Sequence, residues 1–238
     1  MRLDQLLVER GLVSSREKAR AIILAGQVRV DGQKVDKAGH AVSTDARVEL
    51  IETPRYVGRG GLKLEAALQH FRISAEGKIC LDIGSSTGGF TDCLLQHGAA
   101  RVYAIDVGTA QLDWKLRNDP RVVLYEQVNA RYLSRREVPE PIDLAVADVS
   151  FISVTMILPA VAALLTKDAE MVILVKPQFE LERQQVGKGG IIRDPELHRQ
   201  ACQRVEDAVR QLGFQTAIIP SPVLGAEGNQ EFLLYARH

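Results

Sequence analysis

The hydrophobic and polar positions at the start of the chain have the spacing of two short helices. The pattern predicts a first helix over residues 3–10. A second helix is expected to begin near Arg16, because Ser14 stands three residues before Glu17 in the arrangement of a capping box. Gly26 is expected to end that helix, since glycine adopts the left-handed backbone of a helix stop at little cost.

Apolar and polar residues then alternate over Val28–Val35, around a turn. The alternation is centred on Asp31 and Gly32, and an Asp-Gly pair between alternating residues is a strong indication of a β-hairpin. Two helices and a hairpin predict a small α+β unit at this end of the chain.

Beyond residue 79 the pattern changes to short aliphatic runs separated by helical stretches. Strands that alternate with helices are typical of a doubly wound sheet, so we predict a Rossmann-like α/β fold for this part. The expected strands are Ile79–Ile83, Val102–Asp106, Val122–Tyr125, Leu144–Ala147, Met171–Val175, Thr216–Ile219 and Phe232–Tyr235.

The charge of the chain is balanced overall but unevenly distributed. Its 238 residues, enough for a large domain and a small one, include 30 lysines and arginines and 30 aspartates and glutamates. Up to and including Lys63 there are 12 basic and 8 acidic residues, a formal charge of +4, whereas the remainder has 18 and 22, a charge of −4. A basic module indicates a polyanionic partner such as a nucleic acid, although many solvated surfaces carry a similar charge.

A loop of small residues, Gly84 to Gly89, follows the first strand of the predicted sheet. Such a loop lets a ligand approach the backbone, and Asp106, 22 residues beyond Gly84, is placed to accept hydrogen bonds from ribose hydroxyls. Ser86 stands where a dinucleotide fingerprint needs glycine, and Asp82 suits a ligand ammonium better than a diphosphate. We therefore expect S-adenosylmethionine, with NAD as the alternative. The residues expected to bind it are Asp82, Gly84, Ser85, Ser86, Thr87, Gly88, Gly89, Phe90, Asp106, Val107, Asn129 and Asp148, of which Asn129 is equally consistent with a turn.

Charged residues stand at several predicted strand ends. Asp148 and Lys176 each follow a strand, at the carboxyl ends where open α/β sheets bind ligands. Glu231 precedes the last strand and would lie at the same edge if that strand is antiparallel, and Lys63 stands near the start of a helix before the sheet. Each residue alone is also consistent with a surface charge or an ion pair; together they are candidates for catalysis.

The N-terminal order RLDxxL, GLVSSRxxAxxxIxxGxVxVDGxxVxK resembles the S-four-type RNA-binding domain, named after a small-subunit ribosomal protein. We expect this domain over residues 1–52, a linker over 53–60 and the α/β domain over 61–238. The resemblance implies recognition of folded RNA through its shape and backbone, whereas the alternative is a packed cap with a charged face. The residues expected to contact RNA are Arg2, Arg16, Lys18, Arg20, Arg29, Lys37 and Arg59.

Four further motifs resemble the TlyA family, whose members were once called haemolysins. They are DIGSSTGGFT at 82–91, ADVSFIS at 147–153, VKPQFE at 175–180 and GNQEF at 228–232. The resemblance covers nearly the whole chain and implies an S-adenosylmethionine-dependent 2′-O-methyltransferase of the FtsJ-like class, acting on ribosomal RNA or a ribosomal subunit. That class carries a Lys-Asp-Lys-Glu tetrad, which matches Lys63, Asp148, Lys176 and Glu231.

This resemblance leads to an expected division of roles. Lys176 is expected to activate the ribose 2′-hydroxyl, Asp148 to orient Lys176 near the donor methyl, and Lys63 with Glu231 to hold the target ribose. The chain resembles the shorter type of the family, which implies a cytidine in large-subunit RNA. The polar segment Gln178–Asp194 is expected to be either a loop over the substrate or a solvated connector.

Other features narrow the function classes. The longest apolar run, Met156–Leu165, has ten residues, whereas a membrane-spanning helix needs roughly 20. The first residues resemble no secretory signal, so we expect a cytoplasmic protein with no membrane partner, favoured to be a monomer. The three cysteines form no CxxC pair, and no metal site is predicted. Two alternatives remain, a non-catalytic RNA-binding or ribosome-assembly factor and a membrane-lytic protein.

Overall fold

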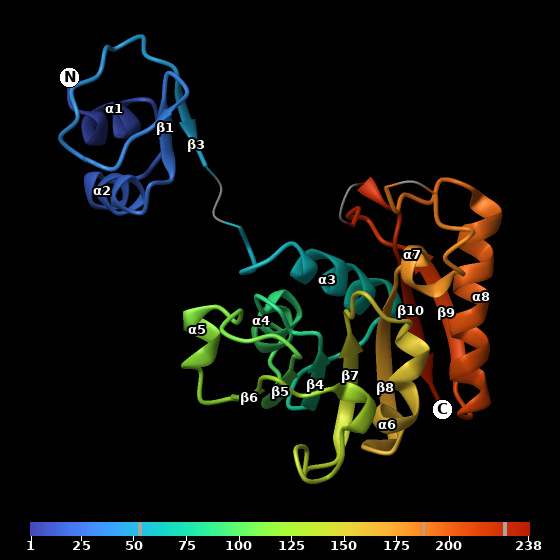
Figure 1. Ribbon diagram of the computed structural model, residues 1–238. Helices are drawn as coiled ribbons and strands as arrows, with labels where there is room; N and C mark the ends of the chain where they lie inside the picture. Colours follow the sequence, from blue (N-terminus) through green and yellow to red (C-terminus); the bar gives the residue numbers. More distant parts are fainter. Residues whose placement is uncertain (52–53, 188, 226–227) are drawn as a thin grey trace. The chain divides into compact units, whose positions relative to one another are not determined.

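The computed structural model describes residues 1–51, 54–187, 189–225 and 228–238. It divides into two compact units, Met1–Arg55 and Tyr56–His238 (Figure 1). The expected linker, residues 53–60, overlaps the start of the second unit, because Tyr56 is buried there against Gly61.

The first unit packs two helices against a three-stranded antiparallel sheet. Its elements are α1 (Leu3–Glu9), α2 (Arg16–Leu24), β1 (Val28–Val30), β2 (Gln33–Lys34) and β3 (Val48–Leu50), with the strand order β2-β1-β3. The predicted hairpin is confirmed: β1 pairs with β2 around Asp31 and Gly32, and both residues have the positive φ that a tight two-residue turn requires. Leu7, Ile23 and Val28 lie in the shared core.

The start of α2 differs by one residue from the expected cap. Ser15, rather than Ser14, is the N-cap, and its side chain accepts a hydrogen bond from the backbone N–H of Lys18. A capping box needs glutamate or glutamine at the third helical position, and Lys18 stands there, so the spacing of Ser14 and Glu17 is one residue out of register with the helix. Gly26 follows the end of the helix with a φ of 66°, as expected.

The second unit is built on a seven-stranded sheet of order β6-β5-β4-β7-β8-β10-β9. Its strands are β4 (Ile79–Ile83), β5 (Arg101–Ile105), β6 (Val122–Tyr125), β7 (Ile142–Ala147), β8 (Leu165–Val175), β9 (Gln215–Pro220) and β10 (Phe232–Arg237). Its helices are α3 (Gly60–Phe71), α4 (Gly89–Gln96), α5 (Trp114–Arg117), α6 (Leu158–Ala162), α7 (Pro177–Glu180) and α8 (Pro195–Gln211), with 3₁₀ turns η1 (Ala130–Tyr132) and η2 (Val154–Met156). The predicted doubly wound α/β fold is confirmed.

Strand β8 is longer than the hydrophobic pattern predicts. The apolar run marks only Met171–Val175, whereas the strand begins at Leu165. Lys167 and Asp168 in its first half are exposed, so their polar character hides that half from a search for buried strands.

Helices cover both faces of the sheet (Figure 1). Helices α3 and α4 bury Leu64 and Leu94 against one face, and α6 and α8 bury Val161 and Val205 against the other. Because alternate strand residues point to opposite faces, both sides of the central strands are buried. Within the described residues, no helix combines the length and the apolar character that crossing a bilayer requires.

Candidate active site

One edge of the sheet collects the charged residues that the sequence singled out. The parallel strands β4, β5, β7 and β8 place their carboxyl ends there, and Asp106, Asp148 and Lys176 follow three of them. Strand β10 is antiparallel, as the placement of Glu231 required, so its first residues lie at the same edge. Helix α3 adds Lys63, which contacts Glu231. The four residues of the tetrad therefore come from four different elements.

Asp148 and Lys176 form an ion pair at this edge. Nζ of Lys176 lies 2.6 Å from Oδ1 of Asp148 and donates a 2.8 Å hydrogen bond to Oγ of Ser150. The side chains of Lys176 and Asp148 are 11% and 22% exposed. The counter-charge of Asp148, whose Oδ1 accepts no hydrogen bond of good geometry from the described residues, and the hydroxyl acceptor of Ser150 thus hold the ammonium of Lys176.

Lys63 and Glu231 form a second, more deeply buried pair. Nζ of Lys63 donates a 2.5 Å hydrogen bond to Oε2 of Glu231, and the side chains are 10% and 3% exposed. Gly225 packs directly against the glutamate, because a Cβ atom at that glycine would collide with the carboxylate. Each lysine of the tetrad is therefore matched by one carboxylate.

A cavity of about 340 Å³ opens beside the Asp148 pair. Its lining includes Asp106, Asn129 and residues 149–152, which are apolar except for Ser150. The two oxygens of Asp106 accept 2.7 Å hydrogen bonds from the backbone N–H groups of Ser86 and Gly108. These bonds orient the carboxylate and leave it further lone pairs for the hydroxyls of a ligand.

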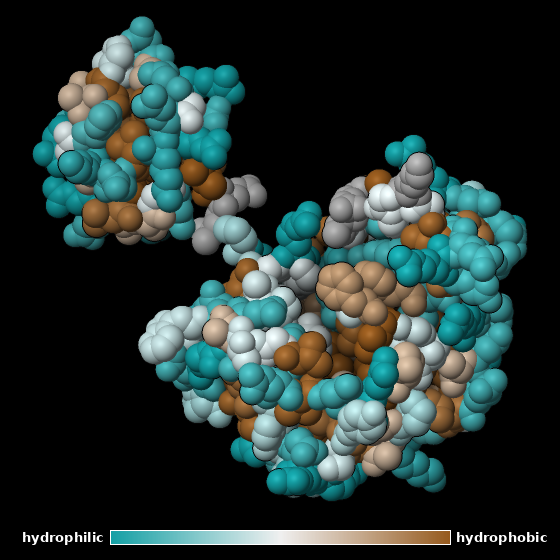
Figure 2. Space-filling model, viewed as in Figure 1, coloured by the Kyte–Doolittle hydropathy of each residue, from teal (hydrophilic) through white to brown (hydrophobic). Residues whose placement is uncertain are grey.

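Exposed hydrophobic residues border this larger cavity. Val107 and Phe151 line it, and they are 70% and 88% exposed. Figure 2 shows that hydrophobic residues gather near the centre of the viewed face of the second unit, whereas its periphery is mostly hydrophilic. Exposed apolar surface of this kind marks a site that a ligand or partner covers.

A second cavity, of about 120 Å³, lies between the loop after β4 and residues 58–60. Ser85 lines it, and its buried Oγ has no hydrogen-bond partner among the described residues. Gly84, Ser86 and Asp148 line both cavities. The two cavities therefore adjoin at Asp148, where the first ion pair stands.

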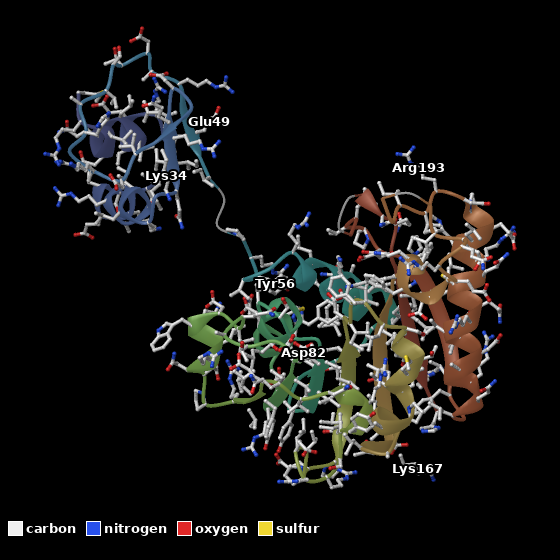
Figure 3. All side chains as sticks on the ribbon, viewed as in Figure 1. Lys34, Glu49, Tyr56, Asp82, Lys167 and Arg193 are labelled. Carbon is white, nitrogen blue, oxygen red and sulfur yellow. The ribbon has the colours of Figure 1, made fainter. Side chains whose placement is uncertain are left out.

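Ten of the twelve residues expected to bind the cofactor line these cavities; Asp82 and Gly88 do not. Gly88 shapes the loop instead: it has a φ of 99°, and a Cβ atom there would collide with Leu116. Asp82 is fully buried inside the second unit (Figure 3), where one oxygen accepts a 2.5 Å hydrogen bond from Oγ1 of Thr91. Its other oxygen has no hydrogen-bond partner among the described residues, and burial raises its pKa to about 7. Asp82 therefore does not line either of these cavities, and its expected place beside a ligand ammonium stays a prediction.

Asn129 and Arg59 have a second role besides the expected one. Asn129 lines the larger cavity, and its side-chain oxygen also accepts a hydrogen bond from the backbone N–H of Arg131. Arg59, expected to contact RNA, lines the smaller cavity together with its neighbours Gly58 and Gly60, which sequence reasoning missed. The glycine-rich run around Arg59 is the sequence feature that could have indicated this wall of the cavity, because glycine permits close packing of the backbone against the loop after β4.

Two buried polar residues outside the tetrad also organise the site, and neither was predicted. Glu180, at the end of α7, accepts hydrogen bonds from Oγ of Ser153 at 2.5 Å and from the backbone N–H of Val154 at 2.8 Å. It therefore ties the helix after Lys176 to the segment after Asp148. Its place in the VKPQFE motif was the available signal.

Asn229 ties the segment Gln178–Asp194 to the loop before β10. Its side chain accepts a 2.9 Å hydrogen bond from the backbone N–H of Ile192 and donates one of 2.9 Å to the carbonyl of Gly190. Ile192 is itself buried. The C-terminal end of the segment Gln178–Asp194 is thus anchored by Asn229, which precedes Glu231 by two positions in the chain.

The six basic residues of the first unit that were expected to contact RNA are all exposed. Three of them, Arg2, Arg16 and Arg20, converge on the buried carboxylate of Asp4, so they form one cluster. The others are Lys18, Arg29 and Lys37.

The donor set of the two cavities fits S-adenosylmethionine. The oriented carboxylate of Asp106 and the apolar wall suit an adenosine, and the unpartnered Oγ of Ser85 suits a polar amino-acid end. Ser86, which stands where a dinucleotide fingerprint requires glycine, also lines the smaller cavity.

Comparison with known proteins identifies the family. Residues 56–238 match the FtsJ-like methyltransferase family and residues 1–48 match the S4 domain. The chain is 46% identical to the 16S/23S rRNA (cytidine-2′-O)-methyltransferase TlyA of Mycobacterium tuberculosis, over 99% of this chain and 89% of that protein. It is 48% identical to Hemolysin A of Brachyspira hyodysenteriae, over 99% of each. A solved structure of a putative hemolysin from Streptococcus thermophilus is 44% identical, with a TM-score of 0.76, over 100% of this chain and 88% of that one. The chain therefore belongs to the FtsJ-like methyltransferases, as a TlyA-type member with an N-terminal S4 domain.

Proposed function

We propose that this enzyme methylates the ribose 2′-hydroxyl of a cytidine in ribosomal RNA, with S-adenosylmethionine as the methyl donor. The observation that carries the proposal is that Asp148 lines both cavities while Nζ of Lys176 lies 2.6 Å from its carboxylate. The S4 domain supports an RNA partner, and the TlyA relative is named for this reaction on both 16S and 23S RNA. A ribosomal RNA substrate implies a cytoplasmic location.

Lys176 is proposed to handle the hydroxyl proton. S-adenosylmethionine, when bound, supplies a methyl group on a sulfonium, which an oxygen nucleophile displaces in line. We infer that Lys176, once its ammonium has released a proton to solvent, accepts a hydrogen bond from the attacking 2′-hydroxyl through the neutral amine. It would then take the hydroxyl proton as the new O–C bond forms and the S–C bond of the donor breaks. Asp148 and Ser150 hold Nζ beside residues that line the larger cavity, which supports a fixed geometry between the hydroxyl and the donor.

The Lys63–Glu231 pair is proposed to hold the target ribose. Both side chains are too buried to act as freely moving charges, and their contact leaves other donor positions of the ammonium available for sugar oxygens. The two pairs then have separate tasks: Lys63 with Glu231 positions the ribose, and Lys176 with Asp148 acts on its hydroxyl.

The role of Lys176 can be tested against a matched lysine on the same strand. Lys167 lies in the exposed first half of β8, at the lower edge of the second unit in Figure 3. Lys176→Ala is expected to lower the rate of methyl transfer to ribosomal RNA at least about 100-fold, since a positioned general base contributes roughly that much. Lys167→Ala is expected to leave it unchanged. Normal methyl transfer by a folded Lys176→Ala protein would contradict the assignment.

The finer proposal is that the target lies in large-subunit RNA. Mapping 2′-O-methyl groups on both ribosomal RNAs, from cells with and without the gene, is expected to reveal one lost cytidine modification in the large subunit. A loss in the small subunit alone would contradict this target. A purified protein that binds RNA and S-adenosylmethionine but methylates neither RNA would instead be a non-catalytic assembly factor.

A further inference from the structure

A buried carboxylate stands at the centre of the arginine cluster of the first unit. The side chain of Asp4 is 0% exposed, whereas Arg2, Arg16 and Arg20 around it are 47%, 47% and 53% exposed. Nε of Arg2 lies 2.9 Å from Oδ1 of Asp4, and Nη2 of Arg16 and Nε of Arg20 lie 3.0 Å and 3.3 Å from Oδ2. The hydrogen bond from Arg2, followed by those from Arg16 and Arg20, holds the pKa of Asp4 well below its usual range. The carboxylate is therefore ionised in the folded protein.

The cluster draws together parts of the unit that are distant in sequence. Arg2 precedes α1, while Arg16 and Arg20 lie one turn apart on α2. The backbone N–H of Asp4 donates a 3.2 Å hydrogen bond to the carbonyl of Ala38, so the segment that also carries Lys37 runs beside the start of α1. The carboxylate of Asp4 thus links the start of α1 to α2, and its backbone N–H links the start of α1 to the segment that carries Lys37.

The charge balance of the cluster favours an additional anion. Three guanidinium groups and one carboxylate leave a formal charge of +2 around Asp4. Each arginine has five N–H donors, and only four donors of the whole cluster are used on Asp4. The exposed sides of the guanidiniums therefore offer donors in the planar arrangement that phosphate oxygens accept.

We propose that Asp4 is a positioning residue of the RNA-binding surface, holding the guanidiniums of Arg2, Arg16 and Arg20 at the spacing at which they bind RNA phosphates. The inference rests on the proposed function, in which the S4 domain binds ribosomal RNA. It differs from an argument based on charge alone. Replacement of Asp4 by asparagine removes a negative charge from a basic surface, which by itself favours RNA binding. Loss of positioning weakens it.

The opposite signs of these two effects define the experiment. The dissociation constant of the full-length protein for purified large-subunit RNA is measured over a range of salt concentrations, for the native protein, Asp4→Asn and Asp36→Asn. Asp36 is an exposed residue of the same unit, so its replacement makes the same change of charge without touching the cluster. We expect Asp4→Asn to bind roughly tenfold more weakly, the effect of losing a charge-assisted contact, and with a salt dependence shallower by about one phosphate contact. Asp36→Asn is expected to bind as well as the native protein or slightly better.

A second variant guards against a folding defect. Arg2→Lys keeps the positive charge at a half-exposed position but loses the two-pronged contact with Asp4. We expect it to weaken RNA binding in the same direction, with thermal unfolding and S-adenosylmethionine affinity unchanged. The proposal is overturned if folded Asp4→Asn binds RNA as tightly as Asp36→Asn, or if Arg2→Lys binds like the native protein. If the native protein itself fails to bind the RNA, the proposed function fails first.

Discussion

The Lys63–Glu231 pair provides a quantitative test of how the tetrad is built. Glu231→Gln removes one charge and leaves the ammonium of Lys63, whose side chain is only 10% exposed, buried without its counter-charge. Removal of one partner of a buried ion pair costs roughly 3–5 kcal/mol of the free energy of unfolding. Replacing both partners by uncharged side chains costs far less, since no charge then remains buried.

The expected changes can be measured by calorimetry on the full-length protein. In a domain the size of the second unit, 1 kcal/mol shifts the melting temperature by roughly 2–4 °C, so Glu231→Gln is expected to lower its transition by about 6–20 °C. The double variant Lys63→Met with Glu231→Gln is expected to recover most of that loss. Glu182→Gln, at an exposed glutamate, is the matched control and is expected to leave the transition in place.

The same variants separate stability from catalysis. We expect the double variant to remain inactive in methyl transfer despite its recovered stability, because the ribose then lacks both of its proposed contacts. The single variants Lys63→Met and Glu231→Gln are compared with the double variant. If the double variant loses as much stability as the two single variants combined, the reasoning is refuted, because stability losses add at independent sites but not within a buried pair. A shift below about 2 °C for Glu231→Gln would refute it as well.

Three further predictions concern single residues in or behind the walls of the cavities. Gly84→Ala is expected to destabilise the second unit by more than about 2 kcal/mol and to abolish S-adenosylmethionine binding, because the φ of Gly84 is 80° and a Cβ atom there would collide with the carbonyl oxygen of Asp148. Gly77→Ala is the calorimetric control: Gly77 has a φ of 68° but open space around it, so the substitution should cost only about 1–2 kcal/mol. Burial raises the pKa of Asp82 to about 7, and only the ionised carboxylate attracts a cationic ligand. The affinity for S-adenosylmethionine, measured by titration calorimetry, should therefore fall roughly tenfold from pH 8 to pH 6. A flat pH profile in the native protein, or an equal slope in Asp82→Asn, would contradict this prediction. Glu180→Gln should lower kcat without changing KM for RNA, because an NH2 group then replaces one of the two oxygens that accept separately from Ser153 and Val154. An unchanged kcat would contradict this role.

Local features of both units could be predicted because short-range physics determines them. The hairpin around Asp31 and Gly32 follows from alternation and from the positive φ that the turn needs. The central strands follow from continuous apolar runs, which a buried parallel sheet requires. The prediction weakens where polar residues interrupt a run, as in the first half of β8, and where two serines compete for one cap, as at Ser14 and Ser15.

The location of the candidate site also follows from the sequence, through topology. Parallel strands bring the residues after them to one edge, so Asp106, Asp148 and Lys176 were expected together. The chemical types of the tetrad came from resemblance to a family rather than from spacing. Glu180 and Asn229 hold neighbouring segments in place by hydrogen bonds. No hydrophobic periodicity or charge pattern in the sequence distinguishes them from ordinary polar positions.

The sequence by itself determined the two units, the strand and helix pattern, and the edge at which charged residues gather, because these depend on local periodicity and strand direction. Only the tertiary structure decided which charged side chains form ion pairs with one another. Lys63 pairs with Glu231 across 168 positions of the chain, Lys176 pairs with Asp148, and three exposed arginines converge on the buried Asp4. Such pairings depend on distances between side chains from separate elements, and those distances exist only once the sheet and helices have packed.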